Sequence, residues 1–171
     1  LKCKERYKGF KLILKIPEVV FPSRDIYTLC YAYFRWFDDI VDSKQLSTKE
    51  IDFIISRQKH FLSQLYLIDT LEEISTEELF LAHLVNFDKI NNKRIRKDLE
   101  TLIGTLEFDS NRRHKIISRQ ELNQYIEDNA LSYTNISLAI FNREHIKKEE
   151  IYKIAKACFM IDFIHDLKKD I

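Results

Sequence analysis

Glycine and proline are scarce in this chain, and their scarcity limits the folds that it can form. Its 171 residues include only two glycines and two prolines. The turns of an all-β sandwich and the phosphate-binding loop of a Rossmann fold need more glycine than that. Apolar residues make up 45% of the chain and charged residues 32%, which is typical of a folded domain with a core. We therefore expect one all-α domain over residues 1–171.

The charge balance bears on the partners to expect, and the cysteines bear on the cellular compartment. The 28 Lys and Arg residues are matched by 27 Asp and Glu residues, so the basic excess of a nucleic-acid-binding protein is missing and we expect no nucleic acid as a partner. The three cysteines lie far apart, without a CxxC pair. This pattern favours a reducing, cytoplasmic compartment over a disulfide framework.

Capping signals predict where the helices begin. A serine precedes a glutamate by three residues at Ser47–Glu50, Ser75–Glu78 and Ser118–Glu121, and each pair can satisfy two free N–H groups of a helix start. Apolar residues then recur with helical spacing. The expected elements are a first segment over Leu1–Ile16, a turn over Pro17–Pro22, and helices over about Ser23–Val41, Thr48–Leu67, Thr76–Asn86, Lys93–Phe108, Arg119–Asn142 and from Lys147 onward.

Two groups of aspartates lie on these helices. Asp38 and Asp42 are four residues apart, so their carboxylates lie one turn apart on one face. Like charges at this spacing destabilise a helix, and the negative end of its dipole adds to the repulsion. Asp162, Asp166 and Asp170 repeat the spacing among Phe, Ile and Leu residues. This pattern predicts an acidic stripe along a largely buried helix, where carboxylates require a partner.

A divalent cation is one partner that would suit both groups. If the two helices face each other, their carboxylates surround a cavity, and such hard oxygen ligands suit Mg²⁺ together with substrate phosphates. A single pair of aspartates four residues apart is commonly a solvated face. The spacing alone therefore leaves two interpretations open, a metal–diphosphate site and exposed acidic faces.

The residues around both groups are similar to those of a known family. Tyr31 to Asp42 fits the pattern YAxxRxxDDxxD at every fixed position, and Asp162 to Asp170 fits NxxRDxxxD with Asp for Asn and His for Arg. Leu102 to Asp109 resembles a helix with an isoleucine–glycine–methionine–aspartate sequence, in which Gly104 would allow a close approach. The chain thus resembles the squalene/phytoene synthase family, the head-to-head trans-prenyltransferases.

The resemblance implies an isoprenoid-synthase-type helical bundle around a central cavity. It also implies Mg²⁺-dependent head-to-head condensation of two prenyl diphosphates, in isoprenoid or carotenoid biosynthesis. Arg35 and the cation would neutralise the leaving diphosphate. The metal ligands would be Asp38, Asp42, Asp162 and Asp166; the substrate-binding residues Arg35, Lys8, His165 and Asp170; and the catalytic residues Tyr31, Arg35, Asp38, Asp42 and Asp166. Aromatic rings would stabilise an allyl cation in the cavity, and the candidates are Tyr31, Phe34, Phe108, Tyr125, Phe159 and Phe163.

Departures from the family pattern keep a second function open. Gly9 replaces the serine of a serine–phenylalanine pair, with Lys8 beside it as a substitute for diphosphate binding. The family's YxxxVAGxxG segment becomes Tyr125 to Tyr133, which has two acidic residues and no glycine. That segment resembles non-catalytic relatives that assist assembly of respiratory complex I. Binding or assembly without catalysis is therefore the alternative, and a terpene cyclase of the same fold is a third interpretation.

Other features carry smaller expectations. The basic runs Lys93–Lys97 and Asn111–Lys115 are solvated by default, with weak peripheral attraction to an anionic membrane as the alternative. Cys30 lies on an apolar helix and is expected to pack as a small hydrophobic residue. Because the chain opens on Leu1 and stops at Ile171 inside a helical pattern, we expect a fragment that lacks C-terminal helices.

Overall fold

The computed structural model describes residues 24–67, 74–112 and 115–170, the last five of these by their backbone alone. These residues form helices joined by short connections and contain no strand, which confirms the all-α expectation. The segment 1–23, with Lys8 and the Gly9–Phe10 pair, lies outside the described residues. The helices are α2 (Arg24–Val41), α3 (Thr48–Leu67), α4 (Thr76–Asn91), α5 (Arg96–Arg112), α6 (Arg119–Ile140) and α7 (Lys148–Asp170).

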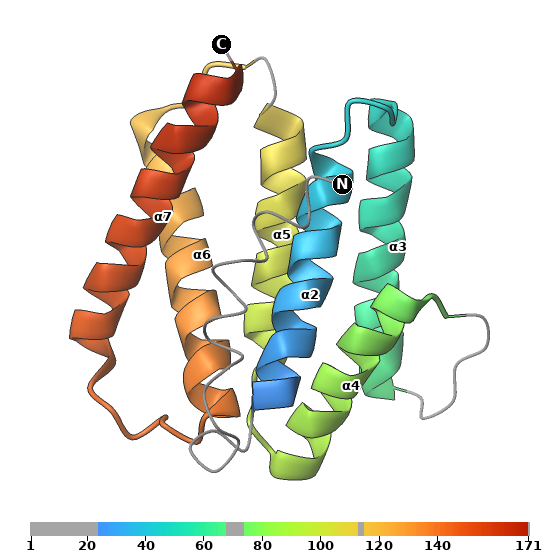
Figure 1. The fold of residues 1–171 in the computed structure, drawn as a ribbon, viewed down its shortest axis with the longest axis vertical. Coiled ribbons are helices and arrows are strands. Elements are labelled where there is room, and N and C mark those ends of the chain that lie inside the picture. The colour runs from blue at the N-terminus through green and yellow to red at the C-terminus, as the bar shows by residue number, and fades with distance from the viewer. Residues whose placement is uncertain (1–23, 68–73, 113–114, 171) are drawn as a thin grey trace.

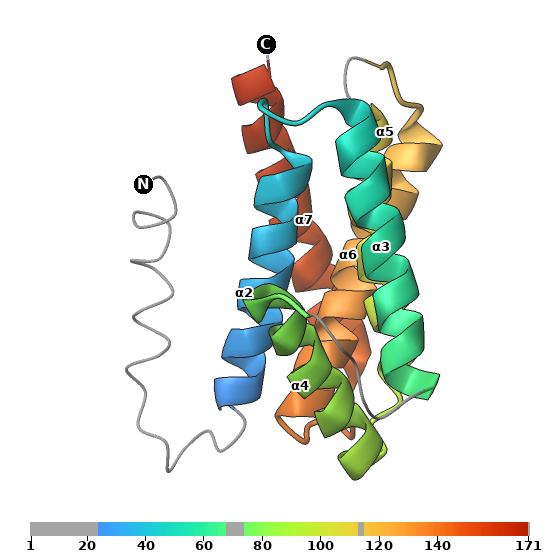
Figure 2. The same ribbon diagram turned by 90° about the vertical axis from the view of Figure 1, so that its right-hand side faces the viewer.

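The helices form a bundle in which α5 has a central place. It packs against α2, α3 and α6, while α7 packs on α6 and α4 packs on α2 and α3. Figure 1 shows α7 at one edge and α3 at the other. The C-terminal ends of α2, α5 and α7 lie at the same end of the bundle (Figures 1 and 2). Both acidic motifs lie near such an end, so the topology places them at one end of the molecule.

The three predicted capping boxes are all present. The Ser75 N–H donates to Glu78 Oε2 at 2.9 Å, and the Glu78 N–H donates back to Ser75 Oγ at 3.1 Å. The pairs Ser118–Glu121 and Ser47–Glu50 make the same reciprocal bonds. Local sequence therefore fixes the starts of α3, α4 and α6, because each box satisfies N–H groups that the helix itself leaves free.

The bounds of α4 and α5 differ from the sequence prediction. Asn92 and Arg94 adopt left-handed backbone with φ of 50° and 61°, so α5 begins at Arg96 rather than near Lys93. Helix α4 continues to Asn91 rather than ending near Asn86, and α5 continues to Arg112 rather than ending near Phe108. In α4 the reason is Asp88, which is buried and accepts hydrogen bonds from Tyr66 Oη at 2.5 Å and from the Ile95 N–H at 3.3 Å.

The core lies between α2, α3, α4, α5 and the C-terminal part of α6. On α2 its members recur every three or four residues, at Cys30, Tyr33, Phe37 and Val41. Cys30 packs as the small hydrophobic residue expected, and burial raises the pKa of its thiol to about 12. Gly104 makes no close approach to a neighbour among the described residues, because a Cβ added there would meet no atom within 4 Å, and its expected approach to a ligand stays a prediction.

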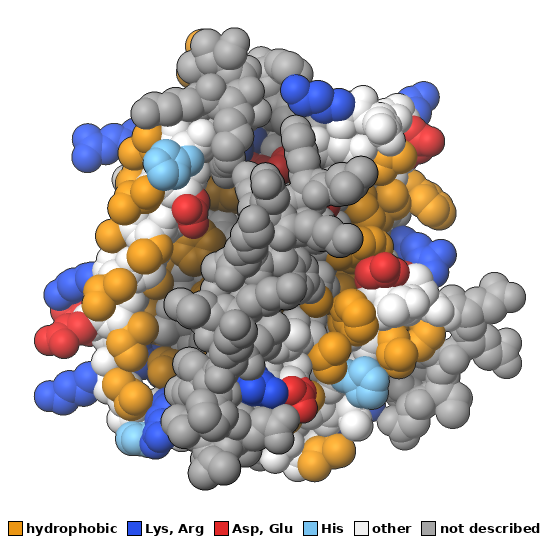
Figure 3. Space-filling model, viewed as in Figure 1, with side chains coloured by type: hydrophobic (Ala, Val, Ile, Leu, Met, Phe, Trp, Pro, Cys, Tyr) orange, Lys and Arg blue, Asp and Glu red, His pale blue; other side chains and the backbone are white. Residues whose placement is uncertain are grey.

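Helix α7 is less buried than its sequence suggested. Phe163 is 8% exposed, whereas Ile154 is 67%, Ile161 54% and Ile164 46% exposed. Hydrophobic side chains line the outer side of α7 in the space-filling view (Figure 3). The helix packs on α6 by one side, so its opposite side stays open among the described residues. None of the helices in the described ranges combines the length and apolar character that crossing a bilayer requires.

Candidate metal centre

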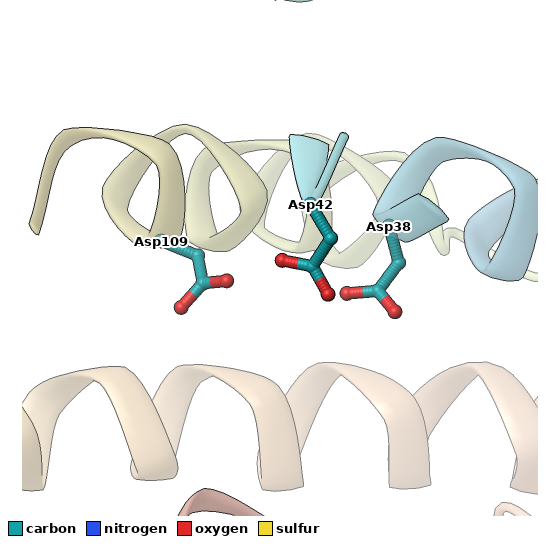
Figure 4. Close-up of side chains that lie close together, drawn as sticks. All are labelled: Asp38, Asp42 and Asp109. Carbon is teal, nitrogen blue, oxygen red and sulfur yellow. The ribbon is translucent and has the colours of Figure 1, made fainter. Parts of the chain in front are cut away.

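Three aspartates from two helices meet at one end of the bundle. Asp38 lies in the last turn of α2, Asp42 follows its end, and Asp109 lies in the last turn of α5. One carboxylate oxygen of each lies within 4.8 Å of the other two. Figure 4 shows the three side chains projecting to the same side, with Asp42 between the others. We call this group the aspartate triad.

The packing of α2 against α5 explains how the triad forms. Phe37 and Val41 are fully buried, and each immediately precedes an aspartate, so Asp38 and Asp42 lie at the edge of the core. On α5 the buried Thr105 lies one turn before Asp109. Apolar contacts between the helices therefore force the carboxylates together, and the negative ends of both helix dipoles point the same way.

A guanidinium lies on each side of the triad. Arg35 Nη1 donates to Asp38 Oδ2 at 2.6 Å, and its Nη2 pairs with the exposed Asp39. Arg112 Nε donates to Asp109 Oδ1 at 2.5 Å. Each guanidinium thus holds a triad carboxylate of its own helix. The side chains of Arg35 and Arg112 are 22% and 15% exposed.

The carboxylates of the triad repel one another although the two guanidiniums lie beside them. Burial and the charge of Asp42 raise the pKa of Asp38 to about 6, although Arg35 acts in the opposite direction. When ionised, the triad and Asp39 carry four negative charges against the two positive charges of the arginines. Three carboxylate oxygens at this spacing are the hard donors that Mg²⁺ prefers, so the donor set fits the expected ion.

Aromatic rings lie beside the triad on the α5 side. The Phe108 and Tyr125 ring centroids are 5.4 Å apart, and those of Tyr125 and Phe163 are 6.1 Å apart. The other candidate rings pack elsewhere, Phe34 against Tyr33 and Phe159 against Tyr133. The described residues do not show the central cavity expected. A small pocket between α3 and α5, lined by Lys59, Leu62, Glu100 and Ile103, includes no triad residue.

The structure brings together some of the predicted site residues. Arg35, Asp38 and Asp42 lie at one place, and the half-buried Tyr31 lies one turn before Arg35 on α2. Asp162 and His165 are exposed on α7, and Asp162 is outside the triad. The side chains of Asp166 and Asp170 lie outside the described residues, so their expected roles stay predictions.

Sequence reasoning missed two residues of this site. The Leu102–Asp109 pattern predicts no ligand role for Asp109, and Arg112 belongs to the basic run Asn111–Lys115, for which the sequence predicts a solvated surface. The available signal was an Asp and an Arg three residues apart at the end of an apolar helix. That spacing indicates a pair on one helix face, but no pattern within α5 reveals that α2 lies beside it.

Comparison of the chain with models of known families, with curated proteins and with solved structures found no match.

Proposed function

We propose that the chain binds Mg²⁺ together with the diphosphate group of a prenyl substrate, and that it acts as a head-to-head prenyltransferase of the squalene/phytoene synthase type. The observation that carries the proposal is the triad, in which Asp38, Asp42 and Asp109 bring carboxylate oxygens within 4.8 Å of one another. The fit of Tyr31 to Asp42 to YAxxRxxDDxxD supports the same function.

Each residue of the site would bind the cation, bind the diphosphate or stabilise the allyl cation. Asp38, Asp42 and Asp109 would hold the cation, which supplies positive charge to the leaving diphosphate. Arg35 now pairs with Asp38 and Asp39. On substrate binding it would exchange one of these contacts for hydrogen bonds to diphosphate oxygens, because a planar guanidinium can donate two hydrogen bonds to such a group. Phe108, Tyr125 and Phe163 offer π faces to a developing allyl cation.

A second candidate function is binding without turnover, as in the assembly-factor relatives. The observation that favours it is the contact between α6 and α7, where the family pattern has small residues. Here Glu127 accepts a hydrogen bond from Lys156 at 2.7 Å, and the Tyr133 ring packs against Phe159 with centroids 6.1 Å apart. Side chains fill this interface, which leaves less room for a prenyl chain.

The test uses farnesyl and geranylgeranyl diphosphates with Mg²⁺, and measures diphosphate release and condensed product. The proposal expects both, and expects Asp109→Asn to abolish them. Asp98→Asn is the matched control, because Asp98 is a half-buried aspartate of α5 that pairs with Asn135 instead. Binding of a non-hydrolysable farnesyl thiodiphosphate without any product would favour the second candidate. Absence of both binding and product would refute the proposed function.

A further inference from the structure

Arg112 occupies an unusual place for an arginine at the end of a helix. Its guanidinium lies over the Phe163 ring of α7, 4.9 Å from the centroid, and 6.0 Å from the centroid of the Tyr125 ring of α6. The side chain is only 15% exposed. The Arg112 side chain of α5 therefore contacts both α6 and α7 beside the triad.

The contacts of Arg112 hold the guanidinium without using all of its donors. The central carbon of the guanidinium lies over the Phe163 ring, and Nε donates to Asp109 Oδ1. Arg35 has the equivalent place on α2, bonded to Asp38. Two guanidiniums are thus placed on either side of three carboxylates, each one hydrogen bond away from a proposed metal ligand.

Two arginines beside the triad would suit the binding of a diphosphate, because that group is strongly negative. A diphosphate carries several negative charges of its own, so a diphosphate bound to a cation at the triad would gain from positively charged side chains beside it. An arginine stays protonated at any physiological pH. A guanidinium already held by a ring contact and by the bond to Asp109 also loses little side-chain entropy when an anion binds.

We propose that Arg112 is a diphosphate-binding residue, the partner of Arg35 on the opposite side of the triad. This inference rests on the proposed function and extends it, since it names the group that would contact the second side of the diphosphate. Phe163 and Tyr125 then support the guanidinium, and Asp109 is shared between Arg112 and the cation.

Arg112→Gln tests the inference in two titrations of the full chain. The first measures calorimetrically the affinity for inorganic diphosphate in excess Mg²⁺, and the second measures the affinity for Mn²⁺ alone by electron paramagnetic resonance. We expect diphosphate affinity to fall about 10- to 100-fold, as for loss of a charge-assisted hydrogen-bonded pair. Mn²⁺ affinity should stay equal or rise, because a positive charge beside the cation is removed.

The chain contains a matched control in the same helix. Arg96 pairs with Glu100 at 2.8 Å and lies 4.9 Å from the centroid of the Tyr66 ring, but at the opposite end of α5. Arg96→Gln should leave both affinities unchanged. Arg112→Lys, which keeps the charge and loses the fork, should give an intermediate diphosphate affinity and serves if the Gln variant does not fold.

Each other outcome has a distinct meaning. Unchanged diphosphate affinity in Arg112→Gln would overturn the inference and leave the proposed function intact. A parallel loss of Mn²⁺ affinity would also overturn it, because Arg112 would then act by positioning Asp109. Failure of the unaltered chain to bind diphosphate with Mg²⁺ would refute the proposed function itself, and this inference with it.

Discussion

Glu78 and Asp38 each pair with an arginine, but the other groups around the two carboxylates differ. Glu78 is 3% exposed and accepts from Arg57 Nε at 2.8 Å, from Gln58 Nε2 at 2.9 Å and from the Ser75 N–H at 2.9 Å. Burial alone would raise the pKa of Glu78, but the bonds from Arg57, Ser75 and Gln58 hold it below its usual value. Asp38 has Arg35 as its partner and two other carboxylates beside it, and its pKa rises to about 6.

Ionised Glu78 therefore stabilises the fold, whereas ionised Asp38 destabilises it. Glu78 is surrounded by hydrogen-bond donors from Arg57, Gln58 and Ser75. Tyr33 extends this network by donating to Gln58 Oε1 at 2.9 Å. Around Asp38 the packing of α2 on α5 adds negative charge instead. A half-buried carboxylate held under repulsion costs stability, and binding a cation would offset this cost.

The largest expected effect comes from Glu78→Ala. This change removes the partner of Arg57 and Gln58 and half of the capping box of α4, so we expect a loss on the order of 3 kcal/mol in the free energy of unfolding at pH 7. Urea denaturation measures it. Because the pKa of Glu78 is lowered in the native state, its contribution is present above the unfolded pKa and fades as the pH falls through the native value.

The control for this change is Glu121→Ala. Glu121 has the same place in the capping box of α6 but lies on the surface, so its loss should be much smaller. Equal losses in the two variants would show that the cap alone matters and that the contacts with Arg57 and Gln58 contribute nothing.

Asp38→Asn, unlike Glu78→Ala, should raise the free energy of unfolding. The native pKa of about 6 lies above the ordinary 3.8, so ionised Asp38 destabilises the fold increasingly as the pH rises from 4 to above 6. The asparagine variant should gain on the order of 2 kcal/mol at pH 8 and nothing at pH 4, a figure reduced for a side chain that is 32% exposed.

Denaturation of this variant at both pH values, without divalent cations, is the measurement. Asp39→Asn is the control, because the neighbouring carboxylate is 44% exposed and lies outside the triad. It should show no gain in stability. A loss of stability in Asp38→Asn at pH 8 would mean that the bond to Arg35 outweighs the repulsion within the triad.

The smallest expected effect is that of Gly104→Ala. The residue lies inside α5, and a Cβ there meets open space among the described residues. Alanine should stabilise the chain by about 0.5–1 kcal/mol, because it restricts the unfolded backbone and favours the helix. A thermal midpoint lower than that of the unaltered chain would show that Gly104 does meet a neighbour, as its sequence context suggested.

Local signals predicted the fold better than they predicted the site. The serine–glutamate pairs and the spacing of Cys30, Tyr33 and Phe37 are properties of single helices, so the sequence was enough for them. The late start of α5 was not predictable in this way, because it depends on the left-handed backbone at Asn92 and Arg94.

The site combines residues that lie far apart in the chain. Asp38 and Asp42 could be found because they lie one turn apart within a recognisable motif. Asp109 could not, since it joins them only through the packing of α2 on α5. The exposure of Asp162 was missed for a related reason, because the apolar residues around it indicate burial only if another element covers that side of α7.

The central claim is that Asp38, Asp42 and Asp109 form one divalent-cation site, and Mn²⁺ binding tests it most directly. Titration of the unaltered chain at pH 7.5, followed by electron paramagnetic resonance, should show a site that Asp109→Asn weakens at least about tenfold and that Asp98→Asn leaves unchanged. Asp109 decides the matter because it was assigned by the structure and not by the motif. Equal Mn²⁺ affinity in Asp109→Asn and in the unaltered chain, or no Mn²⁺ site in the unaltered chain, would contradict the claim.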